Sequence, residues 1–64
     1  MITRYDIRQG TMFKYKDEYQ ITGKLWFMIT SIVDDKNVEV MWSDGITCLL
    51  SAQSIIDDSF IEVF

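Results

Sequence analysis

The sequence contains no proline and no histidine, and it has only one cysteine and three glycines among 64 residues. A lone cysteine excludes an intrachain disulfide, and without histidine that thiol cannot complete the ligand sets that zinc prefers. The first residues lack the apolar stretch of a secretory leader, and no run approaches the roughly 18 apolar residues that span a bilayer. These absences predict a cytoplasmic protein that uses no membrane, metal or other cofactor.

What is present is a large apolar fraction. Apolar residues make up 48% of the chain and aromatic residues 14%. We therefore expect one domain, residues 1–64, that is stabilised by its core, with residues 1–10 as an N-terminal arm. Aromatic side chains that do not fit inside so small a core would form an apolar surface patch.

The net charge is -4, from ten acidic and six basic residues. This charge opposes non-specific attraction to DNA or RNA. Five of the six basic residues lie in the first 24 positions, where they could follow a phosphate backbone or form a solvated face; we favour the solvated face. They are Arg4, Arg8, Lys14, Lys16 and Lys24.

Residues 25–50 hold three apolar runs separated by the polar turns DDKN and SDG. We predict strands over residues 25–33, 38–42 and 46–50, because the runs are rich in β-branched and aromatic residues. Alternation in VEVMW places Val38, Val40 and Trp42 on one face. Alternation in the first run is imperfect: Phe27 and Ile29 share a face, and we expect Met28 and Ile32 to share one only if a bulge shifts the register between them. In the second turn, Asp44 and Gly45 are expected to supply positive backbone dihedrals.

The flanking segments complete the pattern. Residues 11–16 predict a first strand, and residues 17–24 a loop. Residues 51–59 predict a short helical turn capped by Ser51, and residues 60–64 a closing strand with Ile61 and Val63 on one face. This order predicts an all-β fold, a small five-stranded SH3-like barrel with a short helical turn before the last strand. Closure would remove the exposed sheet edges.

Three stretches, GTMFKYK at 10–16, MWSDG at 41–45 and IEVF at 61–64, carry a family resemblance. In them the chain resembles a group of small SH3-like proteins common in bacteriophage genomes. The resemblance covers most of residues 10–64, and its motifs mark turns and core positions. It implies the superfold of KOW and Tudor domains, which bind nucleic acid or modified peptides.

Catalytic chemistry finds little support. The pairs Asp34–Asp35 and Asp57–Asp58 could serve acid–base work or hold a cation, but both adjoin turns, where aspartate favours the local geometry. Cys48 could be a nucleophile, yet it lacks a histidine base and lies in an apolar strand, which favours a buried small side chain. We therefore predict that the protein is not an enzyme.

The aromatic residues Tyr15, Tyr19, Trp26 and Trp42 are stronger candidates for contact with a partner. Because neighbouring strand residues face opposite ways, either Trp26 or Phe27 must point outward. Trp42 and Phe27 fit the core, whereas Tyr19 lies in the polar loop.

The leading hypothesis is a non-enzymatic module that binds another protein, with a host protein as partner if the chain is phage-encoded. The partner-binding surface would include Tyr19, Trp26, Met41, Asp34 and Asp35. One alternative is a nucleic-acid-binding accessory domain of the KOW or Tudor type. Another is a homo-oligomeric structural protein whose surplus aromatic residues are buried against a symmetry mate.

Overall fold

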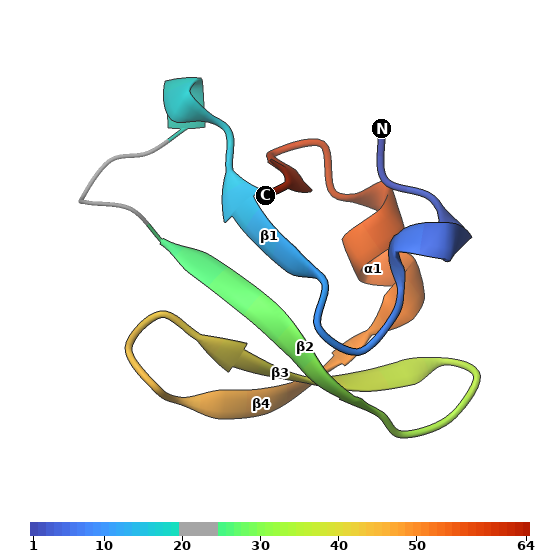
Figure 1. The fold of residues 1–64 in the computed structure, drawn as a ribbon. Helices are drawn as coiled ribbons and strands as arrows, with labels where there is room; N and C mark the ends of the chain where they lie inside the picture. Colours follow the sequence, from blue (N-terminus) through green and yellow to red (C-terminus); the bar gives the residue numbers. More distant parts are fainter. Residues whose placement is uncertain (20–24) are drawn as a thin grey trace.

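The computed structural model describes residues 1–19 and 25–64 as one antiparallel sheet with a short helix (Figure 1). The sheet has five strands, in the order β4-β3-β2-β1-β5. This confirms the expectation of a mostly-β chain with a short helix before the last strand. In chain order the elements are η1 (Arg4–Asp6), β1 (Met12–Tyr15), η2 (Asp17–Tyr19), β2 (Trp26–Ile32), β3 (Asn37–Trp42), β4 (Thr47–Ser51), α1 (Ala52–Asp57) and β5 (Ile61–Val63).

The sheet is not closed into a barrel, so the prediction of a closed five-stranded barrel is wrong. β4 and β5 lie at opposite ends of the sheet, and in the described part of the chain each pairs with a single neighbour. The N-terminal arm and α1 lie beside the sheet (Figure 1). Ile2 from the arm and both Ala52 and Ile55 from α1 are buried in the same cluster as the strand residues. Helix and arm thus bury the apolar face that strand closure was expected to bury.

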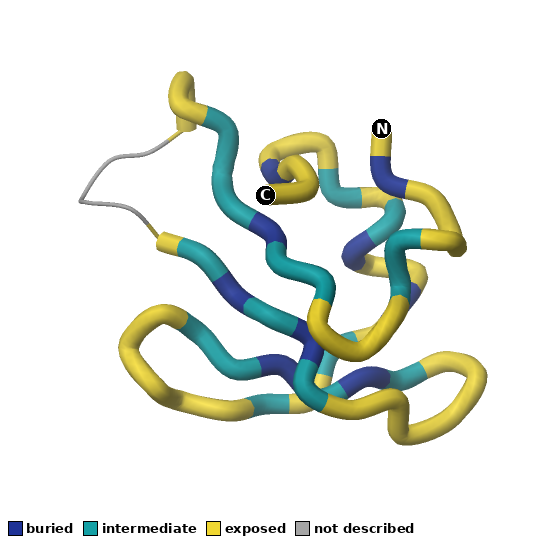
Figure 2. Tube along the Cα trace, in the orientation of Figure 1, coloured by how far each residue is buried: buried dark blue, intermediate teal, exposed yellow. Residues whose placement is uncertain are grey.

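The core lies on one face of the sheet, and Figure 2 shows its buried segments on the central strands, the arm and α1. Val38, Val40 and Ile61 are buried, as predicted. Phe13 stacks on Phe27 with ring centroids 5.2 Å apart. Phe27 therefore points inward and Trp26 outward, because the two are neighbours on one strand.

β2 contains a bulge between Met28 and Ile32, but the expectation that such a bulge would place these two residues on one face is wrong: it places them on opposite faces. Its register with β3 shifts between Ile29 and Ser31, so that Thr30 is the extra residue. The shift places Ile32 opposite Val38, on the core side of the sheet, although Ile32 is itself 47% exposed at the strand end. A bulge of this kind bends its strand and increases the local twist.

The β3–β4 turn differs in detail from the prediction. Gly45 has a φ of 90°, but no residue other than glycine has a positive φ in the described chain, so Asp44 does not supply one. Asp44 stabilises the turn with its side chain instead, since its Oδ1 accepts the Ile46 N–H at 3.0 Å. Trp42 N–H donates to Ile46 O at 2.8 Å and closes a three-residue loop.

Ser51 caps α1 as expected, since its Oγ accepts the Ser54 N–H at 3.4 Å. The predicted strands over 11–16, 25–33, 38–42, 46–50 and 60–64 are all present, and each end lies within one residue of those bounds. The predicted loop over 17–24 begins with the turn of η2. Its remainder, including Lys24, lies outside the described residues.

Candidate interaction surfaces

The face of the sheet opposite the core has three methionine residues near its centre. Met12 lies directly opposite Met28, and Met28 lies directly opposite Met41, so three thioether side chains form a row across β1, β2 and β3. All three are half-buried. We call this surface the outer face; by strand register and alternation it comprises Met12, Lys14, Trp26, Met28, Thr30, Glu39, Met41, Thr47, Leu49, Glu62 and Phe64.

Trp26 and Met41, two of the residues expected to bind a partner, share this face. Trp26 pairs with Lys14 on β1, and its carbonyl accepts the Ser43 N–H at 2.8 Å. Met41 is two residues before Ser43, so it lies diagonally from Trp26 across the β2–β3 ladder. The structure therefore brings a large aromatic residue beside the methionine row.

Charged and polar groups surround the row. Lys14 pairs with Glu62, and its Nζ lies 5.7 Å from the ring centroid of Phe64. At the other end, Thr30 Oγ1 donates to Glu39 Oε1 at 3.0 Å. An apolar centre within a polar rim is the usual anatomy of a protein–protein contact surface.

Tyr19 lies elsewhere. Its ring meets that of Phe60 edge-on, with centroids 4.8 Å apart, and it remains 42% exposed. Its backbone N–H donates to Lys16 O at 2.8 Å, while Lys16 N–H donates to Phe60 O at 2.9 Å. Tyr19 thus belongs to a cluster between the end of β1 and the start of β5.

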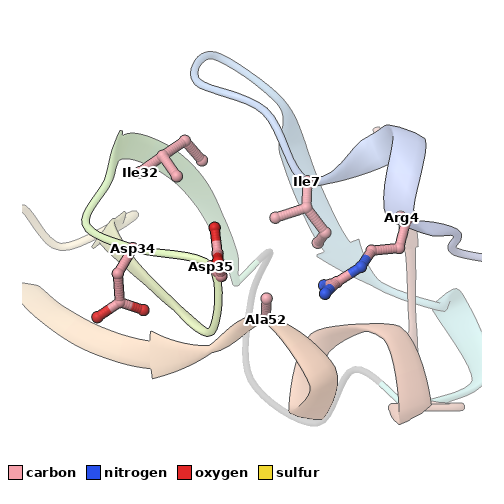
Figure 3. A pocket seen from close by; sticks show the side chains of 6 residues that line it. All are labelled: Arg4, Ile7, Ile32, Asp34, Asp35 and Ala52. Carbon is pink, nitrogen blue, oxygen red and sulfur yellow. The ribbon is translucent and has the colours of Figure 1, made fainter.

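Asp34 acts within its own turn. Its Oδ1 accepts the backbone N–H groups of Lys36 and Asn37, both at 2.8 Å, and the Asn37 side-chain amide at 3.2 Å. The Lys36 N–H, followed by the Asn37 amide and N–H, lowers the pKa of Asp34 from its ordinary value of 3.8. In Figure 3 its carboxylate is turned away from Arg4. The turn lies at the far end of β2 from Trp26, so the acidic pair and the tryptophan do not form one surface.

Asp35 faces a different feature, a pair of shallow, open cavities between the arm, the β2–β3 turn and α1. Arg4 and Asp35 line both, with opposite charges on opposite sides of Ala52 (Figure 3). The larger, about 370 Å³, is lined by Arg4, Ile7, Ile32, Asp34, Asp35 and Ala52. The smaller, about 260 Å³, is lined by Arg4, Asp35, Lys36, Ser51 and Gln53.

The basic residues of the described chain are not gathered on one surface. Arg4 lines the cavities, whereas Lys14 lies on the outer face. Within residues 1–19 and 25–64, no group of three His, Cys, Asp or Glu side chains is arranged to hold a metal ion. The helices in those ranges are all too short or too polar to cross a bilayer.

Sequence reasoning did not identify Met12 or Met28 as members of the surface that holds Trp26 and Met41. Residues two apart on a strand share a face, so the sequence alone indicates that Met12 shares a face with Lys14 and that Met28 shares one with Trp26. Only the pairing register, however, shows that the two patterns lie side by side. No family model, curated protein or solved structure matches this chain.

Proposed function

We propose that the chain is a non-enzymatic interaction module that binds another protein through its outer face. The observation that carries this proposal is the row of Met12, Met28 and Met41 with Trp26 beside it. Methionine adapts its shape to an apolar partner, and tryptophan is enriched where binding energy concentrates.

The partner that fits this surface has an apolar centre and a basic rim. The chain carries a net charge of -4, and Glu39 and Glu62 lie at the edge of the methionine row. Opposite charges on a partner would speed association and fix the orientation of binding. In line with the family resemblance, we propose a phage-encoded protein whose partner is a basic host protein.

We further propose that the fold is an open variant of the SH3-like wiring. The sheet order and the helix between the last two strands support this. Hydrogen-bonded closure of the sheet is not part of the proposal.

The test compares two double variants as baits for host proteins. Trp26→Thr with Met41→Thr removes two apolar groups from the outer face and retains good strand propensity. Leu25→Thr with Ile46→Thr is the matched control, because both side chains are exposed and neither belongs to the outer face. Circular dichroism establishes that each variant is folded.

We expect the wild type and the control to capture the same protein and the outer-face variant to lose it. The captured protein, once purified, should bind the wild type in isothermal titration at least tenfold more tightly than the outer-face variant, about 1.4 kcal/mol. Equal capture by all three baits would overturn the proposal. So would binding of a single-stranded oligonucleotide that weakens steeply with salt and depends on Trp26, because that result indicates a nucleic-acid module.

A further inference from the structure

The two edges of the sheet differ in length and composition. β5 has three residues with a glutamate at its centre, whereas β4 has five residues, TCLLS, with no charge and no proline. Natural proteins protect exposed edges with short strands, charged side chains or proline. β5 has two of these protections, and β4 has none.

The backbone groups that β4 presents outward follow from its pairing with β3. Trp42 N–H bonds to Ile46 O at one end of the ladder, and Ala52 N–H bonds to Lys36 O at the other, both at 2.8 Å. Because hydrogen-bonded pairs alternate in an antiparallel ladder, Cys48 and Leu50 bond to β3. The N–H and C=O groups of Thr47, Leu49 and Ser51 therefore point away from the sheet.

The side chains along this edge are also exposed. Leu49 is 63% exposed and lies opposite Glu39 at the margin of the outer face. Ile46, just before β4, is 61% exposed. An uncharged edge with unpaired backbone groups and an exposed leucine at its centre is a template for another strand.

We propose that this strand is β4 of a second copy, paired antiparallel about a two-fold axis through Leu49. The outward groups of Leu49 then bond to those of Leu49 in the second copy, and Thr47 lies opposite Ser51. The Ser51 N–H donates to the Thr47 carbonyl of the second copy, whereas the Ser51 carbonyl belongs to the N-cap of α1, where it accepts the Ser54 hydroxyl at 2.7 Å. The two sheets become one continuous sheet.

Charge favours a second copy as the occupant despite the acidic chain. No charged residue occurs from Gly45 to Ile56, so the pairing places no like charges directly opposite each other. The register is also self-complementary, as an isologous interface requires. This dimer does not depend on the proposed function, because β4 pairing leaves the methionine row of each copy uncovered. The dimer would therefore present two such rows.

Sedimentation velocity from about 10 μM to about 1 mM protein tests the dimer. This range detects even weak association, because a dissociation constant of 1 mM corresponds to a binding free energy of about −4.1 kcal/mol. We expect the wild type to move from monomer to dimer. Leu49→Lys, which adds a charge to the edge, and Ser51→Pro, which removes an outward N–H at a residue whose φ of -73° suits proline, should remain monomeric. Leu25→Lys is the matched control and should dimerise, because Leu25 is also exposed but lies on another strand end.

A crosslinking experiment tests the register. In the Cys48→Ser, Leu49→Cys variant, the only thiols of two paired copies face each other at a Cα separation of about 5.5 Å, within disulfide range. Oxidised glutathione should convert it to a covalent dimer, the two thiols losing two electrons and two protons. Cys48→Ser, Leu25→Cys should remain mostly monomeric.

A wild type that is monomeric at every concentration would overturn the proposal. A dimer that persists in both edge variants would also overturn it, because the interface would then lie elsewhere. The same holds if β4 pairs only with an added extended peptide of another sequence and never with a second copy. Ser51 is not part of the outer face, so Ser51→Pro should still capture the proposed protein partner. Loss of dimerisation and loss of partner binding are therefore distinguishable.

Discussion

The indole of Trp42 donates a hydrogen bond from Nε1 to Sγ of Cys48 across the β3–β4 ladder, at 3.2 Å. The thiol is half-buried, so the expectation of a buried small side chain is only partly right. Cys48 also provides the acceptor that allows the polar end of Trp42 to approach the core, where its ring packs 4.8 Å from that of Phe27.

Cys48→Ala should destabilise the protein by about 1 kcal/mol, because it leaves the Trp42 N–H without its acceptor. Cys48→Ser should lose less, since a hydroxyl can accept the same bond. Urea unfolding followed by tryptophan fluorescence measures both. Equal losses in the two variants would show that the hydrogen bond contributes nothing.

The burial of an isoleucine should decide how much stability is lost when it is replaced by valine. Ile29 is 0% exposed, and Ile29→Val should lower the free energy of unfolding by about 0.5–1.5 kcal/mol. Ile46 is 61% exposed, and Ile46→Val should change it by less than about 0.5 kcal/mol. Thermal unfolding of the pair tests the placement of the core, and a reversed order would contradict it.

Asp34 should give the protein an acid-dependent component of stability. The folded turn lowers the pKa of Asp34 below 3.8, so the ionised carboxylate favours folding. That stability is fully present above the unfolded-state pKa and is lost as the pH falls through the lower folded-state pKa. Carboxyl NMR during acid titration should find Asp34 ionising below 3.8.

Asn37→Ala should raise the pKa of Asp34 toward 3.8, because it removes the side-chain amide that bonds to both carboxylate oxygens. Lys36→Ala is the control, since Asp34 accepts the backbone N–H of Lys36, which alanine retains. An unchanged Asp34 titration in Asn37→Ala would show that the amide does not stabilise the carboxylate.

Gly45→Ala should cost about 1–2 kcal/mol, because Gly45 has a φ of 90°, which disfavours any residue with a Cβ. Steric conflict with the rest of the protein is not the reason, since no atom beyond Gly45 and its two chain neighbours lies within 4 Å of the added Cβ. Gly45→Asn should cost less, because asparagine tolerates left-handed conformations better than alanine. Denaturant midpoints of the three proteins test this order.

Much of the sheet could be predicted from local pattern. The clean alternation of residues 38–42 identified β3 and its buried valines, since a strand with one buried face repeats every two residues. The turn at 43–45 and the Ser51 cap were also predictable, because each depends on residues next to one another in the sequence.

Other features depend on distant residues and could not be read locally. The burial of Ile2 requires α1 and the sheet to cover it, and the open sheet follows from how the arm and helix fill the space. For the candidate surface, the outward direction of Trp26 was predictable from its neighbour Phe27. The methionine row was not, because it requires the register of three strands.

Pairing between Phe13 and Val63 joins the two ends of the chain. β2 pairs with β3, and β3 with β4, through residues much closer in sequence, so those hairpins close shorter loops. The cluster that buries Ile2 also includes Ile61, a second contact between distant parts of the chain. Docking of β5 on β1 therefore carries the largest loop-closure entropy of the sheet, and we expect it to be a late step in folding.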